Sequence, residues 1–204
     1  MTKQIMALVV ALCLCAAASG CTSRESGLIE STASVSFETA QTDSVVLTLE
    51  GREETVLYTT TKSDAYPYRI GVDEQLFSFS HSDEEDIDFI TYRTTGLDTE
   101  LSARMSIFFQ DPPEESGEED YISLAAQMLE AMDYTLEDVQ PVTVGKGNYS
   151  GQKILGSDGK RTQEFYSIPY GAKSVIVNLT YPVEGSEGVA VRMRHMLSTF
   201  EIDQ

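Results

Sequence analysis

The sequence predicts an α+β fold in which two helices cover a largely antiparallel β-sheet. Three observations carry this prediction: period-2 hydrophobic alternation from Ser44 onward, an amphipathic helix in the middle of the chain, and a second amphipathic helix near its end. Runs of strands before each helix are typical of α+β domains, whereas parallel sheets alternate strands and helices one by one. A chain of 204 residues is long enough to form one domain with a real core.

Alternating apolar positions define the strands before the middle helix, which we expect at residues 44–50, 54–61, 68–72, 76–79, 87–91 and 101–109. Gly51-Arg52 and Asp73-Glu74 are predicted turns. The middle helix begins after a Ser116–Glu119 capping box, with Glu118, Glu119 and Asp120 in its first turn. Its apolar stripe consists of Tyr121, Ile122, Ala125, Met128, Leu129 and Met132.

Further strands follow the middle helix, at residues 142–144, 149–155, 161–168 and 175–181. Ser157-Asp158-Gly159-Lys160 predicts a hairpin turn between two of them. Pro182 ends the last strand, and Gly185-Ser186 opens the second helix. The apolar stripe of that helix consists of Val189, Met193, Met196, Leu197 and Phe200. Arg192, Arg194 and His195 lie toward its C-terminal end, where positive charge suits the helix dipole.

The N-terminus has the pattern of an export signal. Lys3 precedes an uninterrupted apolar run over residues 5–18. As a helix this run covers about 21 Å, which is too short for a hydrocarbon core of about 30 Å. A retained membrane-spanning helix is therefore the weaker interpretation.

The end of this segment reads Ala18-Ser19-Gly20-Cys21, which resembles the lipobox of bacterial lipoproteins. The resemblance implies cleavage before Cys21, a signal peptide over residues 1–20, and a diacylglycerol lipid on the Cys21 thiol. An ordinary secretory signal with an incidental cysteine is the alternative. The other two cysteines, Cys13 and Cys15, lie within the signal, so no disulfide is expected in the mature domain.

Residues 21–43 are predicted to be the lipidated cysteine and a tether, and residues 44–204 a single α+β domain. Nine of the 22 residues from 22 to 43 are Ser or Thr, a composition that cannot repay the entropy of ordering. A flexible coil of this length reaches roughly 25 Å. The tether would hold the domain clear of the lipid headgroups.

The net charge of −19 excludes several classes of partner. Such a surface repels phosphate backbones, so nucleic-acid binding is not expected. It also repels anionic headgroups, so membrane attachment must come from the lipid and not from a basic patch.

Motifs that would carry catalysis or metal binding are weak. His81 and His195 have no paired-histidine spacing, and both are predicted to lie at the surface. Ser150-Gly151-Gln152-Lys153 and Ser157-Asp158-Gly159-Lys160 match Ser-x-x-Lys but lie in strand or turn sequence. Gly145-Lys146-Gly147 is a predicted turn, and no Gly-x-Ser-x-Gly or phosphate loop occurs. No cofactor and no metal are predicted.

Two acidic clusters remain. One contains Asp83, Glu84, Glu85, Asp86 and Asp88, between predicted strands. The other leads into the middle helix and contains Asp111, Glu114, Glu115, Glu118, Glu119 and Asp120. Several carboxylates on one loop could hold Ca²⁺, but neither cluster has the register of a calcium hand. Solvated surface charge is the preferred interpretation.

The order of elements resembles the Mog1/PsbP-like group, which includes many small bacterial lipoproteins. The resemblance covers roughly residues 66–202. It depends on Tyr68-Arg69-Ile70-Gly71-Val72-Asp73-Glu74-Gln75-Leu76-Phe77, on the middle helix with the strands after it, and on the ending Met196-Leu197-Ser198-Thr199-Phe200. It implies a sheet covered by helices and used for docking to partners, and it implies no catalytic residues.

These observations favour a lipid-anchored binding or accessory module on the extracytoplasmic face of a bacterial cell membrane. Its expected partners are the membrane, through the lipid at Cys21, and an unidentified envelope protein or ligand. The alternative is an envelope hydrolase or other enzyme whose site is built from dispersed residues. A third class is a calcium-tuned envelope module.

Overall fold

Strand pairing follows the predicted alternation closely. The computed structural model describes residues 41–93, 102–111 and 120–203, and every strand pair within them is antiparallel. The strands are β1 (Thr42–Leu49), β2 (Arg52–Lys62), β3 (Tyr68–Val72), β4 (Phe77–Ser82), β5 (Ile87–Tyr92), β6 (Arg104–Gln110), β7 (Thr135–Leu136), β8 (Gln140–Val144), β9 (Tyr149–Ser157), β10 (Arg161–Tyr170), β11 (Lys173–Pro182) and β12 (Glu201–Ile202). The predicted α+β class with largely antiparallel strands is therefore confirmed.

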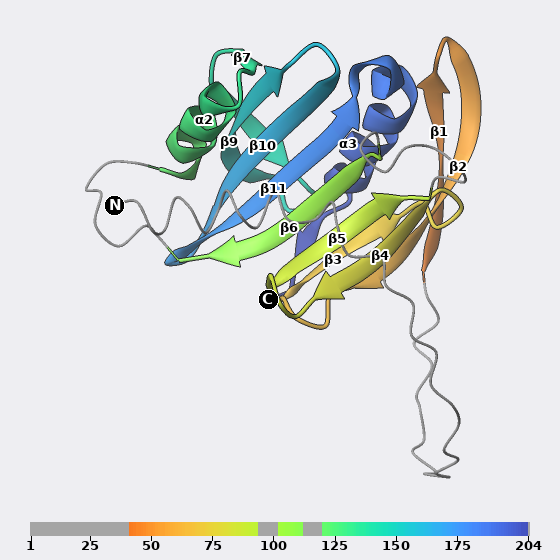
Figure 1. Ribbon diagram of the computed structural model, residues 1–204. Helices are drawn as coiled ribbons and strands as arrows, with labels where there is room; N and C mark the ends of the chain where they lie inside the picture. The colour runs from red at the N-terminus through yellow and green to blue at the C-terminus, as the bar shows by residue number, and fades with distance from the viewer. Residues whose placement is uncertain (1–40, 94–101, 112–119, 204) are drawn as a thin grey trace, which may run out of the picture. The chain divides into compact units, whose positions relative to one another are not determined.

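Within the described ranges the strands divide between two sheets (Figure 1). Sheet A has the order β1-β2-β3-β12, and sheet B runs β4-β5-β6-β11-β10-β9-β7, with β8 also paired to β9. The chain passes from sheet A to sheet B at the turn after β3 and returns to sheet A through its last strand. Period-2 alternation cannot assign a strand to a sheet, so this division was not predictable from the sequence.

Two helices accompany the sheets. Helix α2 (Tyr121–Ala131) packs on β9 and β10 of sheet B (Figure 1). Helix α3 (Val191–Ser198) follows a 3₁₀ turn, η3 (Val183–Gly185), and a π-helical turn, η4 (Ser186–Ala190). The second helical segment thus begins near the predicted Gly185-Ser186 but becomes a regular α-helix only at Val191. Among the described residues, no helix is long and apolar enough to cross a membrane.

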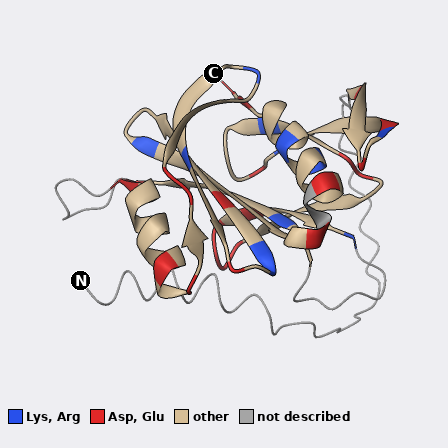
Figure 2. Cartoon of the chain, turned by 90° about the horizontal axis from the view of Figure 1, so that it is seen from above, with Lys and Arg blue, Asp and Glu red and all other residues tan. Residues whose placement is uncertain are grey.

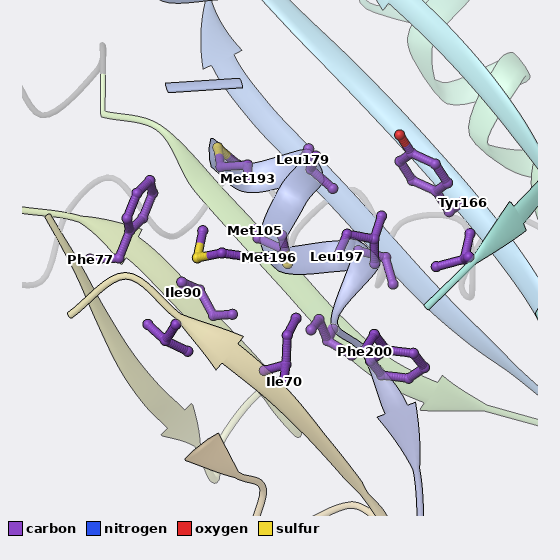
Figure 3. Close-up of a cluster of buried hydrophobic side chains, with 14 of the residues drawn as sticks. Ile70, Phe77, Ile90, Met105, Tyr166, Leu179, Met193, Met196, Leu197 and Phe200 are labelled. Carbon is purple, nitrogen blue, oxygen red and sulfur yellow. The ribbon is translucent and has the colours of Figure 1, made fainter. Parts of the chain in front are cut away.

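The core joins α3 to both sheets (Figure 3). Met193, Met196 and Leu197 of α3 belong to one buried cluster with Ile70 of β3 in sheet A and Leu179 of β11 in sheet B. All of these side chains are buried. Helix α3 is therefore the element through which the two sheets share one hydrophobic core.

Several predicted boundaries are shifted. Strand β1 begins at Thr42, two residues inside the predicted tether. The first hairpin turn is Glu50-Gly51, both with positive φ as a two-residue type I′ loop requires, and Arg52 already pairs with Leu49. The prediction of a Gly51-Arg52 turn was wrong by one residue. Glu50 and Gly51 both adopt the left-handed conformation, so the glycine is the second residue of the turn and not the first.

The ends of both helix stripes also differ from the prediction. Asp120 is the N-cap of α2 and not a first-turn residue, since its Oδ1 accepts the backbone N–H of Ser123 at 2.8 Å. The predicted Ser116–Glu119 capping box lies outside the described residues. Met132 is the exposed C-cap residue and does not join the buried stripe. Phe200 is buried, but it lies beyond the end of α3.

Candidate functional site

The one predicted modification site, Cys21, lies outside the described residues, so the lipid attachment remains a prediction. What the structure adds is a set of buried charged groups that the sequence did not indicate. Asp88 and Glu164 are fully buried, and Asp73 and Arg192 nearly so. Because burying a charge without partners is costly, each of these groups needs hydrogen-bond donors or acceptors around it.

Asp88 is held by side chains from three other places in the fold. Ser63 Oγ and Tyr68 OH donate to its Oδ2 at 2.5 and 2.7 Å. His81 Nδ1 lies 2.9 Å from its Oδ1. These partners come from the loop after β2, from β3 and from β4, so one carboxylate ties the end of sheet A to the edge of sheet B. Burial and the negative charge of Asp88 raise the pKa of Tyr68, which keeps that hydroxyl a donor.

His81 is oriented by this carboxylate. With Nδ1 directed at Asp88, the other ring nitrogen, Nε2, points toward the exposed Asp83, whose Oδ1 is 3.6 Å away. The ring also meets the edge of Tyr66, with centroids 6.2 Å apart. His81 was predicted to be a surface histidine in a polar turn. The residue is exposed as predicted, but it lies on strand β4 and not in a turn, and its imidazole, 24% exposed, reaches the buried Asp88.

The acidic segment before β5 is therefore not one cluster. Asp88 belongs to β5 and points into the protein, so its assignment to a solvated turn was wrong. Asp83, Glu84 and Asp86 are exposed, and Asp86 takes the left-handed φ of 54° that closes the turn. In the described part of the chain, no three His, Cys, Asp or Glu side chains come together in a way that could hold a metal ion.

A second network surrounds Glu164 on β10. Its Oε1 accepts from Arg194 Nε at 2.9 Å and Nη2 at 2.5 Å, and also from Tyr181 OH. Its Oε2 accepts from Tyr166 OH at 2.6 Å. Burial alone would raise the pKa of Glu164, but hydrogen bonds from Arg194 and the two tyrosines outweigh it, so the pKa is lowered. The network fastens α3 to sheet B.

This lowered pKa predicts a pH-dependent contribution to stability. A carboxyl with a folded-state pKa below its ordinary 4.5 stabilises the fold above that pH, and the contribution is lost as pH falls through the folded value. Glu164→Gln should cost about 1–2 kcal/mol at pH 7, a low figure because the partner Arg194 is 45% exposed and screened. Urea unfolding of both proteins from pH 7 to pH 3 should show the difference between them shrinking below pH 4.5. A difference that stays constant with pH would contradict this assignment.

A third network lies on the other side of α3. Arg192 Nη1 donates to Asp73 Oδ2 at 2.8 Å, and Nη2 donates to Glu54 Oε1 at 2.5 Å. Arg192 was predicted only to complement the helix dipole. It is in fact a buried ion-pair partner, because the side of α3 that carries it packs against sheet A. The turn residue Asp73 was likewise missed as its partner.

His195 is also not a free surface group. Its ring lies 4.7 Å from that of Tyr58, and burial lowers its pKa. Tyr58 is buried, and its hydroxyl has no hydrogen-bond partner among the described residues.

The weak catalytic motifs lie where the sequence placed them. Ser150 and Lys153 are on strand β9, while Lys160 is in the β9–β10 turn. In that turn Asp158 Oδ1 accepts the backbone N–H groups of Lys160 and Arg161 at 2.8 and 2.6 Å. Gly145 has a φ of 72° in the turn after β8, as the predicted turn requires. Among the described residues, none of these side chains forms a hydrogen bond or an ion pair with His81 or Glu164.

Of the three networks, the Asp88–His81 pair most resembles an arrangement used in catalysis or metal binding. A buried carboxylate that orients an imidazole is a feature of general bases and of metal-ligating histidines. Here the outward nitrogen faces the carboxylate of Asp83, and not the hydroxyl or thiol that such an imidazole would activate. The fold and these networks define an antiparallel α+β domain with three buried polar clusters. The Asp88 cluster joins the two sheets, and the Glu164 and Arg192 clusters join α3 to sheet B and to sheet A. Acidic and basic residues are interspersed over the domain (Figure 2).

Comparisons with known proteins give only distant structural likenesses, among them Mog1p and LpqN. No family model matches the chain, and no curated protein sequence matches it. The Ran-binding protein Mog1p of Saccharomyces cerevisiae is 8% identical with a TM-score of 0.44, over 71% of this chain and 95% of that one. LpqN, involved in cell envelope biogenesis of Mycobacterium tuberculosis, is 14% identical with a TM-score of 0.40, over 81% of this chain and 92% of that one. At these values neither likeness supports a shared activity.

Proposed function

We propose that this chain is a lipid-anchored binding or accessory module of the bacterial cell envelope, displayed on the extracytoplasmic face of the membrane. The observation that carries the proposal is the N-terminal pattern: Lys3, an apolar run over residues 5–18, and Ser19-Gly20-Cys21 directly after it. A separate resemblance, in the order of the elements over residues 66–202, suggests a Mog1/PsbP-like domain behind the anchor. The order of strands and helices supports that assignment, and the function would then be docking to an envelope partner.

Cys21→Ser should abolish lipid attachment. Cells that express the unsubstituted chain and are grown with a clickable fatty acid should give a labelled protein in the membrane fraction, and the Cys21→Ser chain should give none. Cys13→Ser and Cys15→Ser are matched controls, because both cysteines lie inside the predicted signal peptide and should leave the label unchanged. Label that persists in Cys21→Ser, or that is absent from the unsubstituted chain, would overturn the proposed anchor.

The alternative, an envelope hydrolase, is favoured by one observation, the Asp88–His81 pair. In a hydrolase the imidazole nitrogen remote from the carboxylate meets the nucleophile or an activated water. In this chain Nε2 of His81 meets Asp83 at 3.6 Å, and the nearby hydroxyls of Ser63 and Tyr68 donate to Asp88 instead. The pair therefore fits a structural clamp better than a catalytic one, and a binding module remains the preferred function.

A further inference from the structure

The free edge of sheet A is strand β1. Among the described strands it pairs only with β2, in an unbroken register from Thr42↔Thr59 to Leu49↔Arg52. Just before it, the carbonyl of Gln41 accepts the N–H of Thr60 at 2.8 Å. Hydrogen-bonded positions alternate along an antiparallel pair, so the odd-numbered residues of β1 bond to β2. The even-numbered residues direct their N–H and C=O groups to the free edge, and they are Thr42, Ser44, Val46 and Thr48.

This edge lacks the devices that usually block strand addition. Charged side chains, proline, bulges and short length keep edge strands from pairing. Strand β1 has eight residues, no proline or lysine and one charge, Asp43. Among the other edge strands, β7 and β12 have two residues each, β8 carries Pro141, and β4 is shorter than β1, with six residues.

The outward face beside this edge is nearly uncharged, although the chain has a net charge of −19. Val46 and Leu57 are 58% and 44% exposed on that face. Their direct cross-strand partners are Thr55 and Ser44. Glu53 is the one charged residue of the β1–β2 hairpin on this side, and depletion of charge is typical of the centre of an interface.

We propose that β1 pairs with β1 of a second copy of this chain, antiparallel about a two-fold axis near Val46, to join two A sheets into one. An antiparallel self-pair has its axis perpendicular to the sheet, so each even-numbered edge residue meets an even-numbered one. With Val46 on the axis, Ser44 faces Thr48 of the second copy and Val45 faces Leu47. The free N–H and C=O groups of both edges are then satisfied together.

The charges of β1 favour a second copy as the occupant. In this register Asp43 faces Leu49 of the second copy, so no carboxylate opposes another across the new strand pair. Arg52, which pairs with Leu49, shares a row with the Asp43 of the other copy. Like charges directly opposite each other would destabilise such a pair, and here none is present. The strand is thus complementary to itself in hydrogen bonding, in apolar contact and in charge.

Cysteine cross-linking in the full chain tests this pairing. Two Val46→Cys residues would be directly opposite, with Cβ atoms about 5 Å apart. A short bifunctional thiol reagent spans that separation and should give a covalent dimer. Thr55→Cys is the matched control on the same face. It lies one strand further from the edge, so two copies would be about 14 Å apart and should not cross-link. A dimer band that requires Val46→Cys supports the proposal. Equal cross-linking of both variants, or none, overturns it.

The mass of the detergent-solubilised full chain gives an independent measurement. Sedimentation should show a concentration-dependent dimer for the unsubstituted chain. Val46→Lys places two like charges on the axis and should weaken association at least about tenfold. Thr55→Lys should leave association within about twofold, because surface changes away from the contact have small effects. Circular dichroism confirms that both variants are folded. A monomer at every concentration, or equal loss in both variants, would refute the pairing.

Discussion

Arg192→Met is expected to destabilise the domain by about 3–5 kcal/mol, because it leaves a buried carboxylate without its cationic partner. Asp73 is 1% exposed and Arg192 is 6% exposed. Methionine fills a similar volume but supplies no donor to Asp73 Oδ2. The other Asp73 oxygen keeps only the backbone N–H of Gln75 at 3.2 Å. Urea denaturation monitored by circular dichroism measures the loss.

Two further variants separate the buried ion pair from its exposed branch. Glu54→Gln removes the other partner of Arg192, but the Glu54 side chain is 55% exposed, so the cost should be about 0–1 kcal/mol. Asp73→Asn combined with Arg192→Met removes the uncompensated charge and should recover part of the loss. A double variant no more stable than Arg192→Met alone would show that lost packing, and not the stranded charge, causes the effect.

The local elements were predictable because they depend on local physics. The hairpin from β9 to β10 follows from Asp158-Gly159, since the aspartate side chain caps the turn and the glycine takes a φ of 83°. The buried stripe of α2 follows from the spacing of Ile122, Ala125 and Leu129. In each case the signal lies within a few residues of the element that it describes.

The buried charged groups were missed because their partners are distant in sequence. Asp73 and Arg192 are 119 residues apart, and Ser63 and Asp88 are 25 apart. Strand β5 also offers two competing phases, since Ile87 and Phe89 are the larger apolar pair, yet Asp88 and Ile90 face inward. From sequence alone, a carboxylate is assigned to the solvent-exposed face, because its hydrogen-bond donors lie elsewhere in the chain.

One signal could have revealed Glu164. It shares the parity of Tyr166 and Ile168 on β10, and both of those residues are buried. Period-2 alternation therefore places Glu164 on an inward face. An inward carboxylate needs hydrogen-bond donors or a cation, and Arg194 on the last helix supplies both. If the alternation along β10 had been applied to polar residues as well as apolar ones, it would have predicted a buried ion pair at Glu164.

Leu129→Asp is expected to cost more than about 4 kcal/mol and to leave little folded protein, because it buries an unpaired charge. Leu129 is fully buried on the sheet-facing side of α2. A Cβ added to Gly156 of β9 would lie only 3.1 Å from its Cδ1, which shows how closely the helix approaches the strand. An aspartate at this fully buried position would be removed from water unless α2 separated from sheet B.

Glu130→Lys is the matched control, since it changes the neighbouring residue on the exposed side of the same helix. It should alter stability by no more than about 0.5 kcal/mol. Leu129→Ala creates a cavity without burying a charge, so it should fall between the two at about 2–5 kcal/mol and remain folded. Thermal and urea unfolding of the three variants give the order. Equal effects of Leu129→Asp and Glu130→Lys would mean that α2 does not bury the face that carries Leu129. Burial is the reason that a charge at position 129 should destabilise the fold more than a charge at position 130.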